Sequence, residues 1–247
     1  MTQYGFFFDQ SRCSGCNACA VACKSWHKLP PGPLKYLKVY EYEKGSFPDV
    51  RMHFQWVPCY HCQDPACVGI CPSEAIYKEK KYGAVLIDSE KCTGCRMCYE
   101  ACPYGAPVFE SDELTATAAK CTMCFDRLGQ ELKPICTLAC PDRALDFGPL
   151  DALMERYGGT ADLEDLPGSR TTRPAVLFKP HLAKRRLVPY DTRRIIELMM
   201  ERDKLPALFV SSDDVMEIPP GTVGRDCLVI KHETADELLR YTRNDEG

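Results

Sequence analysis

Sixteen of the 17 cysteines in this 247-residue chain fall into four closely spaced runs, and no other feature limits the fold as strongly. Cysteine makes up about 7% of the residues, a share that indicates disulfides or metal sites. The segments between the runs must fold around whatever these side chains bind. The runs, in chain order, are Cys13, Cys16, Cys19 and Cys23; Cys59, Cys62, Cys67 and Cys71; Cys92, Cys95, Cys98 and Cys102; and Cys121, Cys124, Cys136 and Cys140.

The N-terminal residues have neither the basic region nor the long apolar stretch of a signal peptide. We therefore expect a cytoplasmic location, where thiols stay reduced and bind metal instead of forming disulfides. Export as the folded cargo of a partner with a twin-arginine signal is the alternative. No stretch approaches the roughly 18 apolar residues of a membrane-spanning helix, so no direct membrane span is expected. A net charge of −4 argues against nucleic acid as a partner.

The spacing within the runs indicates iron–sulfur clusters. Runs one and three follow C-x2-C-x2-C-x3-C, the pattern by which bacterial ferredoxins bind 4Fe–4S clusters. Runs two and four keep both ends of this pattern but lengthen the middle gap to four and eleven residues. In such a run three cysteines hold one cluster, and the fourth, which follows after three intervening residues, holds the neighbouring cluster. Proline follows the last cysteine of three runs, whereas Lys24 follows Cys23.

An internal repeat supports this grouping. Residues 7–16 match residues 86–95 in character, since each segment has an apolar strand, an Asp, a basic residue and a cysteine loop with Gly. Residues 71–76 likewise resemble residues 140–145. We therefore predict an α+β fold with two pseudo-symmetric bacterial ferredoxin-like modules of the βαβ type, each holding two clusters. A zinc-binding structural module is the alternative from another class, but zinc needs only four ligands and gains nothing from a third evenly spaced cysteine.

The order of the runs resembles the iron–sulfur subunits of the dimethyl sulfoxide reductase family of molybdenum and tungsten enzymes. The long fourth run, from Cys121 to Cys140, and the segment from His61 to Cys67 carry this resemblance, which covers roughly residues 4–150. It implies that runs one and four share two clusters and that runs two and three share two more. Because Cys95 is present where some relatives have another residue and hold a 3Fe–4S centre, four 4Fe–4S clusters are implied.

The resemblance also implies a ligand set for each cluster. The four sets are Cys13, Cys16, Cys19 and Cys140 for cluster 1; Cys23, Cys121, Cys124 and Cys136 for cluster 2; Cys59, Cys62, Cys67 and Cys102 for cluster 3; and Cys71, Cys92, Cys95 and Cys98 for cluster 4.

All sixteen motif cysteines are used in these sets, so the iron is expected to carry electrons and no catalytic site is expected on this chain. The resemblance implies a large partner subunit that holds a molybdenum or tungsten bis-pterin cofactor, and a further electron-accepting or membrane-anchor subunit is compatible with it. The alternative partner is a hydrogenase or a quinone-linked membrane complex. Basic residues near the cysteine loops are candidates to offset the negative charge of the clusters: Arg12, Lys24, Lys91, Arg96, Lys120 and Arg127.

We assign residues 1–150 to the four-cluster domain and residues 151–247 to an α/β C-terminal extension that docks on another subunit. Alternating apolar residues predict strands over 37–42 and 52–57 in the first domain. In the extension the patterns predict helices over 150–157, 192–203 and 235–241 and strands over 175–178, 208–210 and 227–230. The remaining cysteine, Cys227, is expected to be a small buried core residue.

Overall fold

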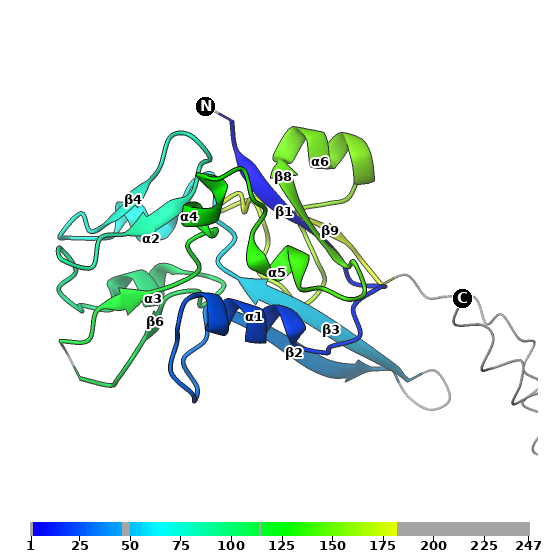
Figure 1. Cartoon of the computed structure of the whole chain (residues 1–247), viewed down its shortest axis with the longest axis horizontal. Coiled ribbons are helices and arrows are strands. Elements are labelled where there is room, and N and C mark those ends of the chain that lie inside the picture. Colours follow the sequence, from blue (N-terminus) through cyan, green and yellow to red (C-terminus); the bar gives the residue numbers. More distant parts are fainter. Residues whose placement is uncertain (1, 46–49, 114, 182–247) are drawn as a thin grey trace, which may run out of the picture. The chain divides into compact units, whose positions relative to one another are not determined.

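The structure, a computed structural model, describes residues 2–45, 50–113 and 115–181, and Figure 1 shows how its short strands and helices alternate in an α+β fold. Among these residues no helix is both long and apolar enough to cross a membrane. Several predictions lie outside the described residues, namely the helices over 192–203 and 235–241, the strands over 208–210 and 227–230, and the burial of Cys227.

The strand that precedes the first cysteine run is the centre of a three-stranded sheet. β1 (Tyr4–Asp9) pairs antiparallel with β8 (Leu145–Pro149), which follows the fourth run. On its other side β1 pairs parallel with β9 (Val176–Lys179), so a strand beyond residue 150 completes this sheet. The helix α6 (Leu150–Tyr157) follows β8 directly and confirms the predicted helix.

The consecutive aromatic residues of β1 are buried on both faces of the sheet, as its central position requires. Phe6 and Phe8 pack with Trp56, and the ring centroids of Phe6 and Trp56 are 5.1 Å apart. Phe7 points to the opposite face, where it packs on Leu153 of α6 and stacks on the ring of Tyr157 at 4.1 Å. Burial of each such ring contributes about 1.5–3 kcal/mol, so this sheet anchors both ends of the cysteine-rich region.

A second, smaller sheet has the same relation to the other two runs. β4 (Ile76–Lys78) follows run two, β5 (Val85–Ile87) precedes run three, and the two strands pair antiparallel. In both sheets, therefore, the strand before one cysteine run pairs with the strand after another run. The repeated segments of the sequence thus occupy equivalent places in the two sheets.

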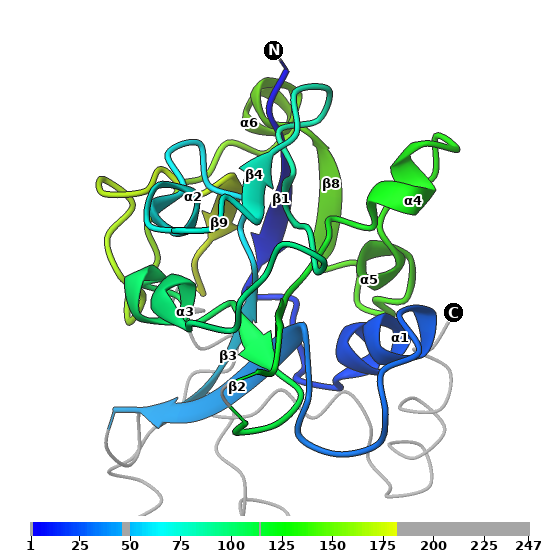
Figure 2. The same ribbon diagram turned by 90° about the vertical axis from the view of Figure 1, so that its left-hand side faces the viewer.

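The two strands predicted between runs one and two form a long hairpin, which Figure 2 shows along one side of the described residues. β2 (Leu37–Lys44) pairs antiparallel with β3 (Arg51–Pro58), with Leu37 opposite Pro58 and Lys44 opposite Arg51. Only the end of β3 nearest run two is buried, since Gln55–Pro58 lie in the core. The hairpin thus delivers the chain to Cys59 from inside the core.

The third cysteine of each run lies in a short helix. α1 (Ala18–Trp26) contains Cys19 and Cys23 and lies beside α5 (Ile135–Leu138), which contains Cys136 (Figure 2). The other short elements are α2 (Ala66–Gly69), α3 (Met97–Ala101) and α4 (Phe125–Leu128) and the paired strands β6 (Val108–Phe109) and β7 (Ala118–Ala119).

Candidate iron–sulfur sites

The loops of runs one and three have the same backbone conformation. Gly15 and Gly94 precede the second cysteine of their runs, and both have φ of +73°. At Gly15 a side chain would also collide with the ring of Phe54, because an added Cβ would lie 2.3 Å from its nearest atom. Glycine is therefore required there both for the positive φ and for the close approach of β3.

Runs two and four show a matching equivalence after their last cysteine. Glu74 and Arg143 each lie three residues beyond that cysteine, and they have φ of 50° and 51°. Such left-handed backbone costs non-glycine residues about 1–2 kcal/mol each. Glu74 and Arg143 have unlike side chains but the same conformation. The conformation is therefore set by the turn that leads from the cysteine to the following strand.

The first predicted set comes together around the loop of run one. The pKa of Cys19 is raised to about 12, first by burial and then by the nearby thiols of Cys13, Cys140 and Cys16 in that order. Burial likewise raises the pKa of Cys13, with Cys140 and Cys16 adding to the rise. The Sγ of Cys140 accepts a hydrogen bond from the Ala144 N–H at 3.3 Å. The last cysteine of run four thus lies with the first three of run one.

The second predicted set is the most deeply buried. Burial raises the pKa of Cys136 well above its ordinary value, and Cys121, Cys124 and Cys23 add to the rise. Burial also raises the pKa of Cys23 to about 12, chiefly with Cys124. The Met123 N–H donates to the Sγ of Cys121 at 3.4 Å. A hydrogen-bond donor thus points at the sulfur in this set too.

Lys24, which replaces the proline expected after Cys23, has a structural consequence. Because its backbone N–H is available, α1 continues past Cys23 to Trp26. His27, the next residue, is thereby placed with its Nε2 3.9 Å from the Sγ of Cys124. The imidazole is a candidate donor to the second set that the spacing of histidines in the sequence did not reveal.

The third predicted set lines a single cavity. Cys59, Cys62, Cys67 and Cys102 all face it. Burial raises the pKa of Cys67 to about 12 and that of Cys62 to about 11, with charge repulsion from Cys59 and Cys102 in both cases. The Ala106 N–H donates to the Sγ of Cys102 at 3.4 Å.

The fourth predicted set joins run three to the last cysteine of run two. The pKa of Cys98 is raised to about 11 by burial together with repulsion from Cys92, Cys95 and Cys71. The Sγ of Cys92 accepts a hydrogen bond from the Ala118 N–H at 3.4 Å. The thiols of run three thus lie close to the Cys71 thiol.

The donor chemistry of these sets fits 4Fe–4S clusters. Each set offers four sulfur atoms, and in each at least one sulfur accepts a backbone N–H, the contact that tunes a bound cluster. The raised pKa values mean that metal binding must expel protons from the buried thiols, which couples cluster insertion to folding. Within the described ranges no three His, Cys, Asp or Glu side chains are spaced for a single metal ion.

The four sets lie in series. Cys19 and Cys23 on α1 connect the first set to the second, and the charge of Cys59 in the third set acts on Cys121 in the second. α2 and α3 connect the third set to the fourth, because each links a cysteine of one set to a cysteine of the other. Of the sixteen cysteines only Cys16 and Cys95 are exposed, and they belong to the first and fourth sets.

Most of the basic residues proposed to offset cluster charge are bonded to the loops. Lys24 donates to the Gly32 carbonyl at 2.8 Å, and Arg96 donates to the carbonyls of Ser111 and Glu113. These side chains therefore brace loops, whatever further effect their charge has. Lys120 and Arg127 differ from these two residues because they are buried.

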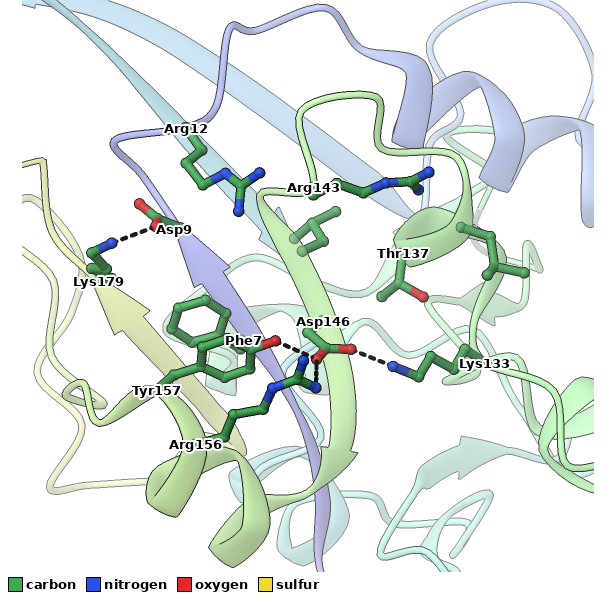
Figure 3. A pocket seen from close by; sticks show the side chains of 12 residues that line it. Phe7, Asp9, Arg12, Lys133, Thr137, Arg143, Asp146, Arg156, Tyr157 and Lys179 are labelled. Atoms are coloured by element: carbon green, nitrogen blue, oxygen red, sulfur yellow. Dashed lines mark hydrogen bonds and ion pairs between the residues drawn. The ribbon is translucent and has the colours of Figure 1, made fainter.

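A basic pocket lies beside the first set, between α5, α6 and one face of the three-stranded sheet (Figure 3). Asp146 at its centre binds Lys133 at 2.5 Å, the Tyr157 hydroxyl at 2.7 Å and Arg156 at 3.4 Å. Its other carboxylate, Asp9, pairs with Lys179 at 2.8 Å. Arg12 and Arg143 also line the pocket, and neither forms an ion pair among the described residues. Only folding reveals this pocket, because its residues are scattered from position 7 to position 179.

Comparison with known proteins agrees with this geometry. A family model described as a 4Fe-4S dicluster domain matches residues 50–150. One polypeptide of the anaerobic dimethyl sulfoxide reductase of Escherichia coli (strain K12) is 42% identical over 192 residues, which cover 74% of this chain and 92% of the relative. One polypeptide of the sulfite dehydrogenase of Allochromatium vinosum is 40% identical over 169 residues, which cover 60% of this chain and 69% of the relative. Protein NrfC of Escherichia coli (strain K12) is 38% identical over 150 residues, which cover 60% of this chain and 66% of the relative.

Proposed function

Since this chain is a member of the family of iron–sulfur electron-transfer subunits that includes its relative from anaerobic dimethyl sulfoxide reductase, we propose that its four cysteine sets hold four 4Fe–4S clusters forming one electron path. When bound, each cluster accepts and releases one electron. The observation that carries the proposal is the serial arrangement of the sets, with an exposed cysteine only at each end.

The residues of this chain hold and insulate the path. Each set supplies four thiolates, so the chain is a non-catalytic subunit of an oxidoreductase. Aromatic residues cover the third set, since the buried Tyr60 lines the cavity of its cysteines and Trp56 packs beside Tyr60. Electrons would therefore enter and leave beside Cys16 and Cys95, where the path reaches the surface.

The two ferredoxin-like modules are part of this proposal. The pairing of β1 with β8 supports a module formed by runs one and four, and the pairing of β4 with β5 supports one formed by runs two and three. Residues 1–150 would then hold the clusters, while residues 151–247 would dock on another subunit. α6 and β9 tie the start of that extension to the first module.

The catalytic partner is proposed to be a large subunit with a molybdenum or tungsten bis-pterin cofactor. Two relatives are named as parts of a dimethyl sulfoxide reductase and of a sulfite dehydrogenase, and these names support a partner of this kind. The basic pocket suits an acidic partner surface beside the first set, because Arg12 and Arg143 offer unpaired positive charge there. The sixteen reduced thiols support a cytoplasmic site of assembly, with or without later export by the partner.

Anaerobic affinity purification of the tagged chain from its native host, with metal analysis of everything that co-elutes, tests the proposal. We expect about 16 iron atoms per chain, as four 4Fe–4S clusters require, together with a large partner that contains molybdenum or tungsten. Nickel in the partner would support the hydrogenase alternative. Zinc in place of iron, in a colourless protein, would refute electron transfer, and iron without any stoichiometric partner would refute the catalytic complex.

A further inference from the structure

Lys120 is a buried cation for which the protein provides no counter-charge. Lys120 is only 4% exposed. The ammonium donates to the carbonyl oxygen of Val85 and, at 3.1 Å, to that of Cys121. No Asp or Glu forms an ion pair with it anywhere in the described part of the chain, whereas Lys133 and Lys179 of the basic pocket both have carboxylate partners.

Such an arrangement is costly in a protein that lacks bound clusters. Transfer of an ammonium group from water to the protein interior is strongly unfavourable, and buried charges in proteins are accordingly paired or bound to a charged group. Two carbonyl groups satisfy hydrogen bonds of Lys120 but carry no net charge. The missing anion must therefore come from something that the folded chain holds nearby.

The cysteines of two sets are the negative groups within reach. Lys120 directly precedes Cys121 of the second set and bonds to its backbone. Its other acceptor is the Val85 carbonyl, and Val85 lines the cavity that Cys67 and the other cysteines of the third set face. Lys120 thus lies between the second and third sets, the two middle sets of the path, and belongs to neither of the end sets that contain an exposed cysteine.

We propose that Lys120 is the internal counter-charge of the two middle clusters, which raises their reduction potentials and stabilises the holoprotein. The inference rests on the proposed function, since it requires clusters on Cys67 and Cys121. An oxidised cluster with four thiolates carries a charge of about −2, and reduction adds one more negative charge. A nearby buried cation therefore stabilises the reduced form more than the oxidised form, because weak screening in the interior strengthens their attraction.

The test compares three substitutions at this position in the anaerobically purified full-length chain. Lys120→Met removes both the charge and the hydrogen bonds, Lys120→Gln keeps a donor for the two carbonyls, and Lys120→Arg keeps the charge. Lys80→Met, at an exposed position, is the matched control. Iron and sulfide content are measured first, followed by redox titration monitored by electron paramagnetic resonance.

We expect Lys120→Met and Lys120→Gln to shift two of the four midpoint potentials to more negative values, with Lys120→Arg and Lys80→Met close to the unmodified protein. If the two neutral variants lose iron while Lys120→Arg retains about 16 iron atoms, the iron content confirms that the charge of Lys120 is needed for the clusters to assemble. Full iron content with unchanged potentials in Lys120→Met would overturn the inference alone. Iron loss in Lys120→Arg as well would also overturn it, because shape and not charge would then matter. An unmodified chain without iron would instead overturn the proposed function.

Discussion

Asn17 and Arg96 hold the same left-handed backbone conformation, with φ of 59° and 63°, and each directly follows the second cysteine of its run. Each residue also caps the helix that carries the next ligand, α1 in one case and α3 in the other. Asparagine tolerates this conformation, whereas arginine adopts it at a cost. The shared conformation shows that the two loops repeat each other in backbone geometry even where their side chains differ.

Gly15, two positions before Asn17, offers a direct test of the loop geometry. Gly15→Ala should destabilise the protein by at least about 1–2 kcal/mol and lower the iron content, because alanine is strained at φ of +73° and its Cβ would collide with Phe54. Anaerobic urea unfolding and iron analysis measure both effects. Gly168→Ala is the control, since nothing lies within 4 Å of its added Cβ. Equal stability of the two variants would contradict the close packing of β3 on this loop.

The ligand sets predict which cysteine variants share a phenotype. Cys140→Ser should alter the same spectroscopic signal as Cys19→Ser, although 121 positions separate these residues, because both thiols lie in the first set. Cys23→Ser should instead alter the signal that Cys136→Ser alters. Electron paramagnetic resonance spectra of the four reduced variants distinguish the pairs. A match between Cys140→Ser and Cys136→Ser, which are neighbours in the sequence, would refute the exchange of ligands between runs.

Cys95 tests the exposed end of the path. Cys95→Ser should change only the fourth cluster and leave the iron signals of the other three sets intact, because Cys95 is at the surface and lies beside Cys98 of the fourth set. Iron content and spectra of the purified variant provide the measurement. Unchanged iron and spectra would exclude Cys95 as a ligand, and loss of all clusters would show that the sets do not assemble independently.

Asp146 predicts a specific dependence of stability on pH. Burial alone would raise the pKa of its carboxyl, but hydrogen bonds from Lys133, Tyr157 and the Phe147 N–H outweigh burial and lower the pKa below 3.8. A lowered folded-state pKa means that its stabilisation is fully present above the unfolded-state value and disappears as the pH falls through the folded-state value. Asp146→Asn should therefore cost about 1 kcal/mol at pH 7, a figure that allows for the partly exposed partners.

Thermal unfolding of Asp146→Asn and the unmodified protein at several pH values checks this expectation. The difference between them should be the same at pH 7 and pH 5 and should shrink only below about pH 4. Asp151→Asn, on the exposed side of α6, serves as the control and should have little effect. A difference that disappears between pH 7 and pH 5 would show that another group is responsible.

Charge reversal in the basic pocket should weaken binding of the catalytic partner. The double variant Arg12→Glu/Arg143→Glu is expected to lower the affinity at least tenfold, about 1.4 kcal/mol, and to reduce the dependence of binding on salt. Lys80→Glu, at an exposed position that does not line the pocket, is the matched control. Binding measured by sedimentation or surface immobilisation at two salt concentrations gives the answer, and equal affinities for all three proteins would place the partner elsewhere.

The local part of this architecture was predictable from the sequence. Alternating residues over 37–42 and 52–57 predicted β2 and β3, and the amphipathic pattern over 150–157 predicted α6 within its observed bounds. The strand predicted over 175–178 is present as Val176–Lys179. These predictions succeeded because periodicity and turn-forming glycines act over a few residues, the same range over which the pattern is visible.

The chemistry of this protein could be predicted from its sequence, because the spacing of cysteines within a run decides which ligands a loop can present to one cluster. The repeat was visible there too, since both halves need the same turns. Three relationships became clear only from the fold: β9 lies parallel to β1, Arg12 and Arg143 face one pocket, and Lys120 is buried between two sets. Those relationships join segments that are up to about 170 residues apart, and they depend on how the core packs around the sheets, which no local pattern encodes.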